Sequence, residues 1–226
     1  MTTCIIPARG GSRRVPQKNL RNFCKKPMIS WPISTAINSG LFDRVIVSTD
    51  NSEIAEVAQS AGAEIPFKRP KELADDHTPT RPVIAHAIEQ LQLKGPVCCL
   101  YATAPFVLAE DLKRALLQLE TSIVTSVFPV VQYSSSIQRA FWLNSDNDIN
   151  MIQPEYFSSR SQDLEVAWHD AGQFYLADAQ QWRQDLPLFG RGARGIIIPQ
   201  KRAHDIDTEE DWELAELLFH AQRLGI

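Results

Sequence analysis

Short apolar runs alternate with stretches of helical apolar spacing through the first half of the chain. Short apolar runs are typical of strands buried on both faces, and apolar residues three and four positions apart are typical of amphipathic helices. Strands are therefore predicted at 4–6, 44–49, 64–67, 97–101 and 122–128. The helices between them are marked by Asp50 or Ser52 as a cap, by Gly62 as a left-handed stop, by Pro82 in a first turn and by Leu112, Leu116 and Leu119 on one face.

This rhythm predicts an α/β fold of three layers (α/β/α, Rossmann-like), in which helices cover both faces of a mainly parallel sheet. Further strands are predicted at 173–176 and 195–198, and a terminal helix from Thr208 to about Arg223. A chain of 226 residues can bury a sizeable core, so we expect a single domain over 1–226. Ligands of such sheets bind outside the carboxyl ends of the strands.

The rhythm breaks over 131–172, where no long helix is predicted. A strand at 138–143 and a polar turn at 144–150 indicate an inserted hairpin followed by a loop, and the alternative is a solvated excursion. The segment has little core of its own, yet it carries the apolar residues Ile137, Phe141, Trp142, Met151 and Ile152. This favours a dimerisation arm that is buried against a partner subunit.

A small basic loop directly follows the first strand, in the run from Cys4 to Leu20. Gly10 and Gly11 let a polyphosphate approach the backbone, and the cations Arg9, Arg13, Arg14 and Lys18 can neutralise its charge. The spacing matches neither a Walker loop nor a dinucleotide fingerprint. The loop therefore predicts a different kind of nucleoside triphosphate site, and the alternative is a solvated basic turn.

The run from His204 to Trp212 is rich in carboxylates. In an extended backbone Asp205 and Asp207 face the same way, and two carboxylates together with substrate phosphates suit Mg²⁺. The alternative is that the acids cap a helix, since Thr208 with Asp211 resembles a capping box. That alternative does not account for Asp205.

Composition and charge exclude several classes of protein. The net charge of −4 gives no reason to expect nucleic acid binding, and no apolar stretch approaches the length of a membrane span. The four cysteines lack metal-ligand spacing, and no signal peptide precedes Cys4. We therefore expect a cytoplasmic protein. Nothing indicates a Ser-His-Asp triad, and no residue stands out as a general base.

The run 6–20 resembles the first motif of the acylneuraminate cytidylyltransferase family, I-P-A-R-G-G-S-x-x-x-P-x-K-N-L, at every fixed position. The acidic run is similar to that family's I-D-I-D-[ST]-x-x-D-[FW] element, with His204 in place of the first isoleucine. The resemblance implies a nucleotidyltransferase fold, a homodimer joined through the arm, and Mg²⁺ bound by Asp205 and Asp207. It implies Arg9, Lys18 and Asp207 as catalytic residues, with Lys18 or Arg13 stabilising the leaving pyrophosphate. The implied nucleotide-binding residues are Ala8, Arg9, Gly10, Gly11, Ser12, Lys18 and Asn19.

Two further runs extend the resemblance. The loop that starts at Arg69 is similar to the family's R-P-x-x-L-A-x-D loop, which implies cytosine contacts by Arg69 and Thr80. Sugar contacts are implied for Tyr101, His169 and Gln173, and for Arg160 from the partner subunit. Tyr101 stands where sialic acid enzymes usually have glutamine, and Y-A-T-A-P, R-S-Q-D-L and H-D-A-G-Q-F-Y resemble the pseudaminic acid branch.

The implied reaction joins pseudaminic acid to CTP, giving CMP-pseudaminic acid and pyrophosphate. The alternatives are synthesis of CMP-N-acetylneuraminate or CMP-legionaminate. A protein of another class, a non-catalytic nucleotide-binding or glycosyltransferase-like module, would share the fold but not the turnover.

Overall fold

A seven-stranded sheet forms the centre of the computed structural model, which describes residues 1–12, 14–121, 123–184 and 188–224. The strand order is β11-β6-β10-β5-β1-β4, and β9 pairs with β6. β1 is parallel to β4 and β5, β11 is parallel to β6, and β9 and β10 run antiparallel to their neighbours. The prediction of a mainly parallel sheet is confirmed. The bounds are β1 Thr3–Pro7, β4 Arg44–Ser48, β5 Pro96–Leu100, β6 Ser126–Gln132, β9 Trp168–Asp170, β10 Phe174–Asp178 and β11 Ala193–Ile197.

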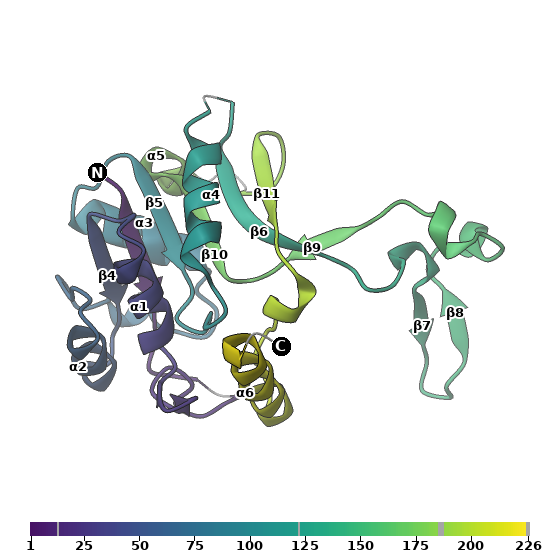
Figure 1. Ribbon diagram of the computed structural model, residues 1–226, viewed down its shortest axis with the longest axis horizontal. Coiled ribbons are helices and arrows are strands. Elements are labelled where there is room, and N and C mark those ends of the chain that lie inside the picture. Colours follow the sequence, from purple (N-terminus) through teal and green to yellow (C-terminus); the bar gives the residue numbers. More distant parts are fainter. Residues whose placement is uncertain (13, 122, 185–187, 225–226) are drawn as a thin grey trace.

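Helices cover both faces of this sheet (Figure 1). α1 (Ser30–Asn38), α2 (Ser52–Ser60) and α4 (Ala109–Leu119) lie on one face, and α3 (Thr80–Gln90) and α5 (Ala179–Arg183) on the other. Alternate strand residues divide between the layers: Cys4 and Ile6 pack toward α1, and Ile5 packs toward α3. The middle residues of β1, β4 and β5 are therefore apolar on both faces of the sheet, which confirms the three-layer prediction.

Three local predictions were wrong. Asn51, rather than Asp50 or Ser52, caps α2, because its Oδ1 accepts the Ile54 N–H at 3.0 Å. The run 64–67 contributes only a single bridge between Glu64 and Ile46. The strand expected from 122 begins at Ser126, because the Val124 N–H closes a turn onto Thr121.

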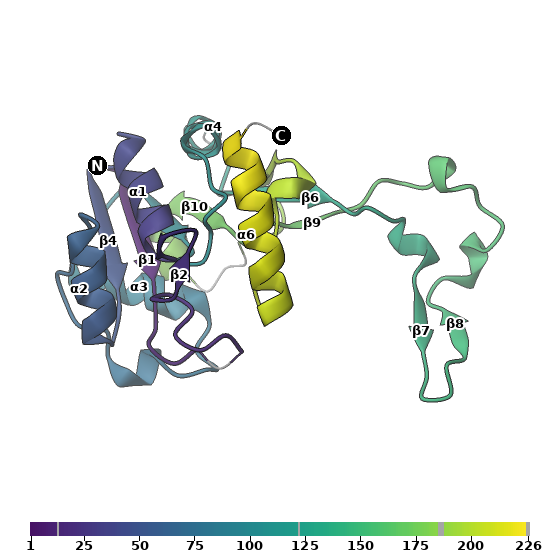
Figure 2. The ribbon, with the colours of Figure 1, turned by 60° about the horizontal axis from the view of Figure 1, so that its bottom comes forward.

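The segment 131–172 leaves the body as a long arm in both views (Figures 1 and 2). Its hairpin pairs β7 (Phe141–Leu143) with β8 (Ile149–Met151), and β9 brings the chain back along β6. The strand predicted from 138 starts at Phe141, because 137–139 form a helical turn. Two further helical turns, at Pro154–Tyr156 and Ser161–Asp163, complete the arm.

The last helix, α6 (Glu209–Leu224), packs on the loop that follows β1 rather than on the sheet. That loop holds the small hairpin of β2 (Asn22–Phe23) and β3 (Lys26–Pro27). The Phe23 ring meets Trp212 and Phe219 edge to face at centroid distances of 5.4 and 5.3 Å. A small separate core thus joins the basic loop to the helix that follows the acidic run. None of the described helices is both long and apolar enough to cross a membrane.

Candidate active site

A cavity of about 620 Å³ opens where β1 and β5 end. Pro7 at the end of β1 and Tyr101 just after β5 both line it, as expected for a parallel sheet. The structure brings many of the predicted residues together on its wall: Arg9, Ser12, Lys18, Asn19, Arg69, Thr80, Tyr101, Asp205 and Asp207.

The basic loop is held by its own polar contacts. The Asn19 side chain donates to the Arg9 carbonyl at 3.0 Å, and the Gly10 N–H donates to Asp50 Oδ1 at 3.1 Å. A Cβ at Gly10 would lie 2.9 Å from Asn51 Nδ2, so this position needs glycine. A Cβ at Gly11 would meet nothing within 4 Å, so packing within the chain does not require glycine there. Ala8 is buried and does not line the cavity.

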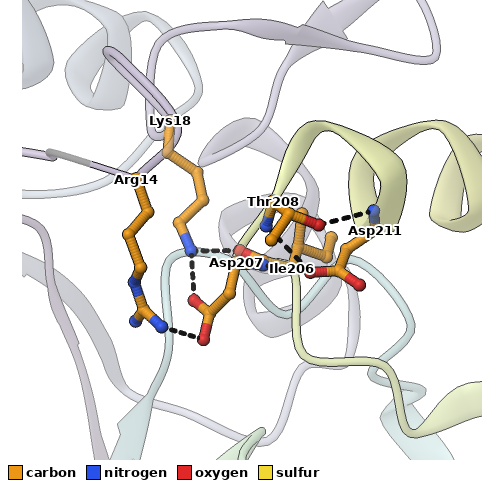
Figure 3. A network of polar contacts seen from close by, with 6 residues as sticks. All are labelled: Arg14, Lys18, Ile206, Asp207, Thr208 and Asp211. Carbon is orange, nitrogen blue, oxygen red and sulfur yellow. Dashed lines mark hydrogen bonds and ion pairs between the residues drawn. The ribbon is translucent and has the colours of Figure 1, made fainter.

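The acidic run meets the basic loop across this cavity (Figure 3). Lys18 Nζ lies 3.3 Å from Asp207 Oδ1, although the two residues are 189 positions apart in the sequence. Lys18 also donates to the Ile206 carbonyl, and Arg14 forms an ion pair with the other oxygen of Asp207. Cations of the basic loop and a carboxylate of the acidic run therefore share one site.

The capping alternative is also correct for the two residues that it named, Thr208 and Asp211. Asp211 Oδ2 accepts the N–H groups of Asp207 and Thr208 at 3.0 and 2.8 Å, and the Asp211 N–H donates to Thr208 Oγ1 at 3.1 Å. The cap starts α6 and shapes the backbone at Asp207. It leaves the side chains of Asp205 and Asp207 on the cavity wall.

The donor set fits Mg²⁺ held jointly by protein and substrate. Among the residues that the structure describes, no group of three or more His, Cys, Asp or Glu side chains could enclose a metal ion. Asp205 and Asp207 offer two carboxylates on the wall of a cavity that is also lined by Arg9 and Lys18. Mg²⁺ usually takes one or two carboxylates and completes its shell with phosphate oxygens and water.

The other side of the cavity is formed by residues that suit a base. Arg69 is buried, and its Nε donates to Ser48 Oγ at 3.1 Å. Burial lowers the pKa of Arg69 to about 10, so the guanidinium is charged at neutral pH. The side-chain oxygens of Thr80 and Tyr101 lie 3.2 Å apart. Arg9 forms an ion pair with Asp76, which joins the basic loop to the loop 71–79, and both loops contribute residues to the cavity wall.

Three predicted sugar contacts do not line this cavity. Gln173 is buried, and its amide donates to the carbonyl of Arg202, whose guanidinium is paired with Asp111. The His169 ring lies at the root of the arm against Tyr133, with ring centroids 4.6 Å apart. Arg160 is exposed in the arm itself.

Two residues that line the cavity make contacts that the sequence does not predict. Arg14 of the basic loop pairs with Asp207. Asp76, the last residue of the R-P-x-x-L-A-x-D run, pairs with Arg9, and the spacing of the two residues does not indicate this contact. Arg13, the alternative to Lys18, lies outside the described residues.

Comparison with known proteins agrees with this geometry. The model of the cytidylyltransferase family matches residues 3–190. The chain belongs to this family. It is 43% identical over 220 residues to a pseudaminic acid cytidylyltransferase of Campylobacter jejuni, covering 96% of this chain and 95% of the relative.

Two further relatives extend the comparison. A CMP-N,N'-diacetyllegionaminic acid synthase of Legionella pneumophila is 32% identical, with 95% of this chain and 94% of the relative covered. The solved structure of a CMP:2-keto-3-deoxy-manno-octonic acid synthetase complexed with CTP superposes with a TM-score of 0.74 at 16% identity, covering 98% of this chain and 99% of that one. At this low identity the superposition shows the fold alone, which is a nucleotidyltransferase fold.

Proposed function

We propose that the protein transfers the CMP group of CTP to pseudaminic acid and releases pyrophosphate. The observation that carries this is the meeting of Lys18 with Asp207, which unites triphosphate-binding cations and a carboxylate pair in one cavity. The choice of sugar is supported by the 43% identity to the Campylobacter pseudaminic acid cytidylyltransferase. Tyr101, which replaces the glutamine usual in sialic acid enzymes, supports the same choice.

The reaction needs positioning and charge neutralisation more than covalent catalysis. The anomeric hydroxyl of the sugar loses its proton and forms a bond to the α-phosphorus of CTP. The bond between the α-phosphorus and the α,β-bridging oxygen breaks, and pyrophosphate leaves with that oxygen. Arg9 and Lys18 neutralise the phosphate charge that grows on the leaving side. Arg69 and Thr80 hold the cytosine ring.

Asp205 and Asp207 are the residues that would hold Mg²⁺. Bound there, the ion would neutralise charge on the phosphate oxygens. Arg14 and Lys18 both contact Asp207, so they orient its carboxylate toward the phosphate side of the cavity.

The arm supports a homodimer in which each site is completed by the neighbouring chain. Trp142 and Phe157 are 68% and 76% exposed, which is costly for aromatic side chains without a partner. In this arrangement Arg160 reaches the sugar from the partner subunit. A mixture of Asp207→Ala and Arg160→Ala variants should then recover about a quarter of wild-type activity, because half of the dimers hold one intact site of two. Equal inactivity of the mixture and its components would contradict the shared site.

The substrate assignment is tested by supplying CTP with pseudaminic, N,N'-diacetyllegionaminic or N-acetylneuraminic acid and measuring pyrophosphate. We expect the highest kcat/KM with pseudaminic acid. Because the chain is also similar to the Legionella synthase, N,N'-diacetyllegionaminic acid is the main alternative substrate. Turnover of legionaminic acid but not pseudaminic acid would overturn the choice of sugar and leave the reaction class intact.

We also propose a cytoplasmic location. All four cysteines are free thiols, as is usual in a reducing compartment. Cell fractionation with an antibody to the protein tests this, and recovery from a secreted or envelope fraction would contradict it.

A further inference from the structure

Arg202 is anchored at two points to the body of the fold. Its guanidinium forms a bidentate pair with Asp111 in the first turn of α4: Nη2 lies 3.3 Å from Oδ1, and Nη1 donates to Oδ2. Its carbonyl accepts a hydrogen bond from the side-chain amide of Gln173, the residue directly before β10. All three residues are buried. Arg202 therefore fixes the short helical turn Gln200–Arg202 both to α4 and to the sheet.

The acidic run begins directly after this turn. Residues 203–208 connect the turn to α6 as irregular chain, and Asp205 lies three positions after Arg202. Further on, the run is held by Ile206, which is buried in the small core beside α6, and by the cap of α6, which binds the Asp207 N–H. Asp205 precedes both of these contacts. Its place on the cavity wall therefore depends on the anchor at Arg202 more than the place of Asp207 does.

Stability alone does not account for these buried polar contacts. A buried ion pair is often no more stabilising than apolar side chains of similar volume, because both charges lose their hydration. Gln173 Oε1 is also buried, and among the described residues it has no hydrogen-bond partner, which is unfavourable. An apolar side chain in place of Gln173 would avoid that cost, but it could not hold the Arg202 carbonyl. The polar contacts add direction, because a bidentate pair fixes the orientation of the guanidinium and of the turn that carries it.

The second anchor also links two parts of the cavity wall. The backbone carbonyl of Gln173 accepts the Tyr101 N–H at 2.9 Å, while the side-chain amide of the same residue holds Arg202. Tyr101 and Asp205 both line the cavity. One buried residue thus connects the strand end at Tyr101 to the start of the acidic run.

We propose that Arg202, held by Asp111 and Gln173, positions the Asp205 carboxylate for Mg²⁺. Octahedral coordination of Mg²⁺ is strict, so a small displacement of one carboxylate weakens the site. Arg202 and Asp111 lie outside the cavity wall and act through the backbone, so they are positioning residues. This inference rests on the proposed use of CTP with Mg²⁺.

Calorimetry of CTP binding in MgCl₂ and in EDTA, without the sugar, tests the proposal. The ratio of the two dissociation constants gives the contribution of the metal to CTP binding. The double variant Asp111→Leu/Arg202→Met replaces the buried pair by apolar side chains, so we expect it to fold. Its metal contribution should fall about 10-fold or more, as when a group that orients a metal ligand is lost. Its affinity for CTP in EDTA should stay unchanged.

Two further variants separate positioning from stability. Arg202→Lys keeps a positive charge beside Asp111 but not the bidentate contact, so the fold should persist while the metal contribution falls. Leu93→Ala removes a buried apolar side chain that packs with α3 outside the cavity. It should lower the midpoint of urea unfolding and leave the metal contribution unchanged.

A wild-type metal contribution in any folded variant at Arg202 would overturn the proposal, as would an equal loss in Leu93→Ala. Asp205→Asn distinguishes this failure from a failure of the proposed function. If Asp205→Asn loses the metal contribution and the variants at Arg202 keep it, only the positioning role is wrong. If Asp205→Asn keeps it, the proposed metal site in the acidic run is wrong, and the positioning role is overturned with it.

Discussion

β1 and β5 in the body are covered on both faces, whereas β7 and β8 in the arm are almost uncovered. Cys4, Ile5 and Ile6 have no exposed surface, while all three residues of β7 are exposed. Since burial of apolar surface is the main stabilising effect in folding, the body can fold on its own core and the arm cannot. The body is covered by its own helices, whereas the exposed residues of the arm have no such cover within the chain, which supports the proposed dimer.

The largest effect is expected from Asp207→Asn, which acts on the body's chemistry alone. Loss of one of the two carboxylates proposed to hold Mg²⁺ should lower kcat about 10³-fold, while CTP binding and assembly persist. Steady-state pyrophosphate release measures the change. Glu213→Gln, an exposed acid on α6 outside the cavity, is the control. Wild-type turnover in Asp207→Asn would remove the acidic run from the mechanism.

The next largest effect concerns the stability of the body. Asp111→Ala would leave the guanidinium of Arg202 buried and short of its main partner, since the two side chains are 3% and 9% exposed. Breaking a buried pair in this way costs about 3–5 kcal/mol. Urea unfolding should show this loss. Glu64→Gln, which breaks the more exposed pair with Arg44, should cost less than about 1 kcal/mol. Equal losses would mean that burial does not set the strength of these pairs.

The contacts of Arg202 illustrate why the sequence predicts the fold but only part of the site. Hydrophobic periodicity predicts strands and helices because each element must bury its own apolar residues. The position of the basic loop after β1 and the spacing of Asp205 and Asp207 were likewise predictable from local geometry. Gln173 was expected at the sugar, but its amide holds the Arg202 carbonyl. That contact joins residues 29 positions apart through tertiary packing, which no local pattern encodes.

A smaller effect is expected from a substitution in the arm, which should change assembly and leave the stability of the body unchanged. Trp142→Asp should raise the dissociation constant of the proposed dimer by about 30-fold or more, which is the effect of losing an aromatic anchor of about 2 kcal/mol. The melting temperature of the body should hardly change. Leu217→Asp is a matched control, because Leu217 on α6 is also 68% exposed and lies outside the arm. Analytical ultracentrifugation that finds both variants dimeric, or both monomeric, would contradict the division between body and arm.

The smallest effect tests the cap that joins the acidic run to α6. The Thr208 hydroxyl, with the N–H groups of Asp207 and Thr208, holds the pKa of Asp211 below its ordinary value of 3.8. A carboxylate whose pKa is lower in the folded state stabilises the fold fully above the unfolded pKa, and this contribution is lost as pH falls through the folded pKa. The difference in unfolding free energy between wild type and Asp211→Asn should therefore be constant between about pH 5 and 7 and shrink below about pH 4. Because the carboxylate is exposed to solvent, the difference should be small, and urea titrations at several pH values can measure it. A difference that grows in acid would mean that Asp211 is not the cap, and that another group holds the backbone of Asp207 at the cavity.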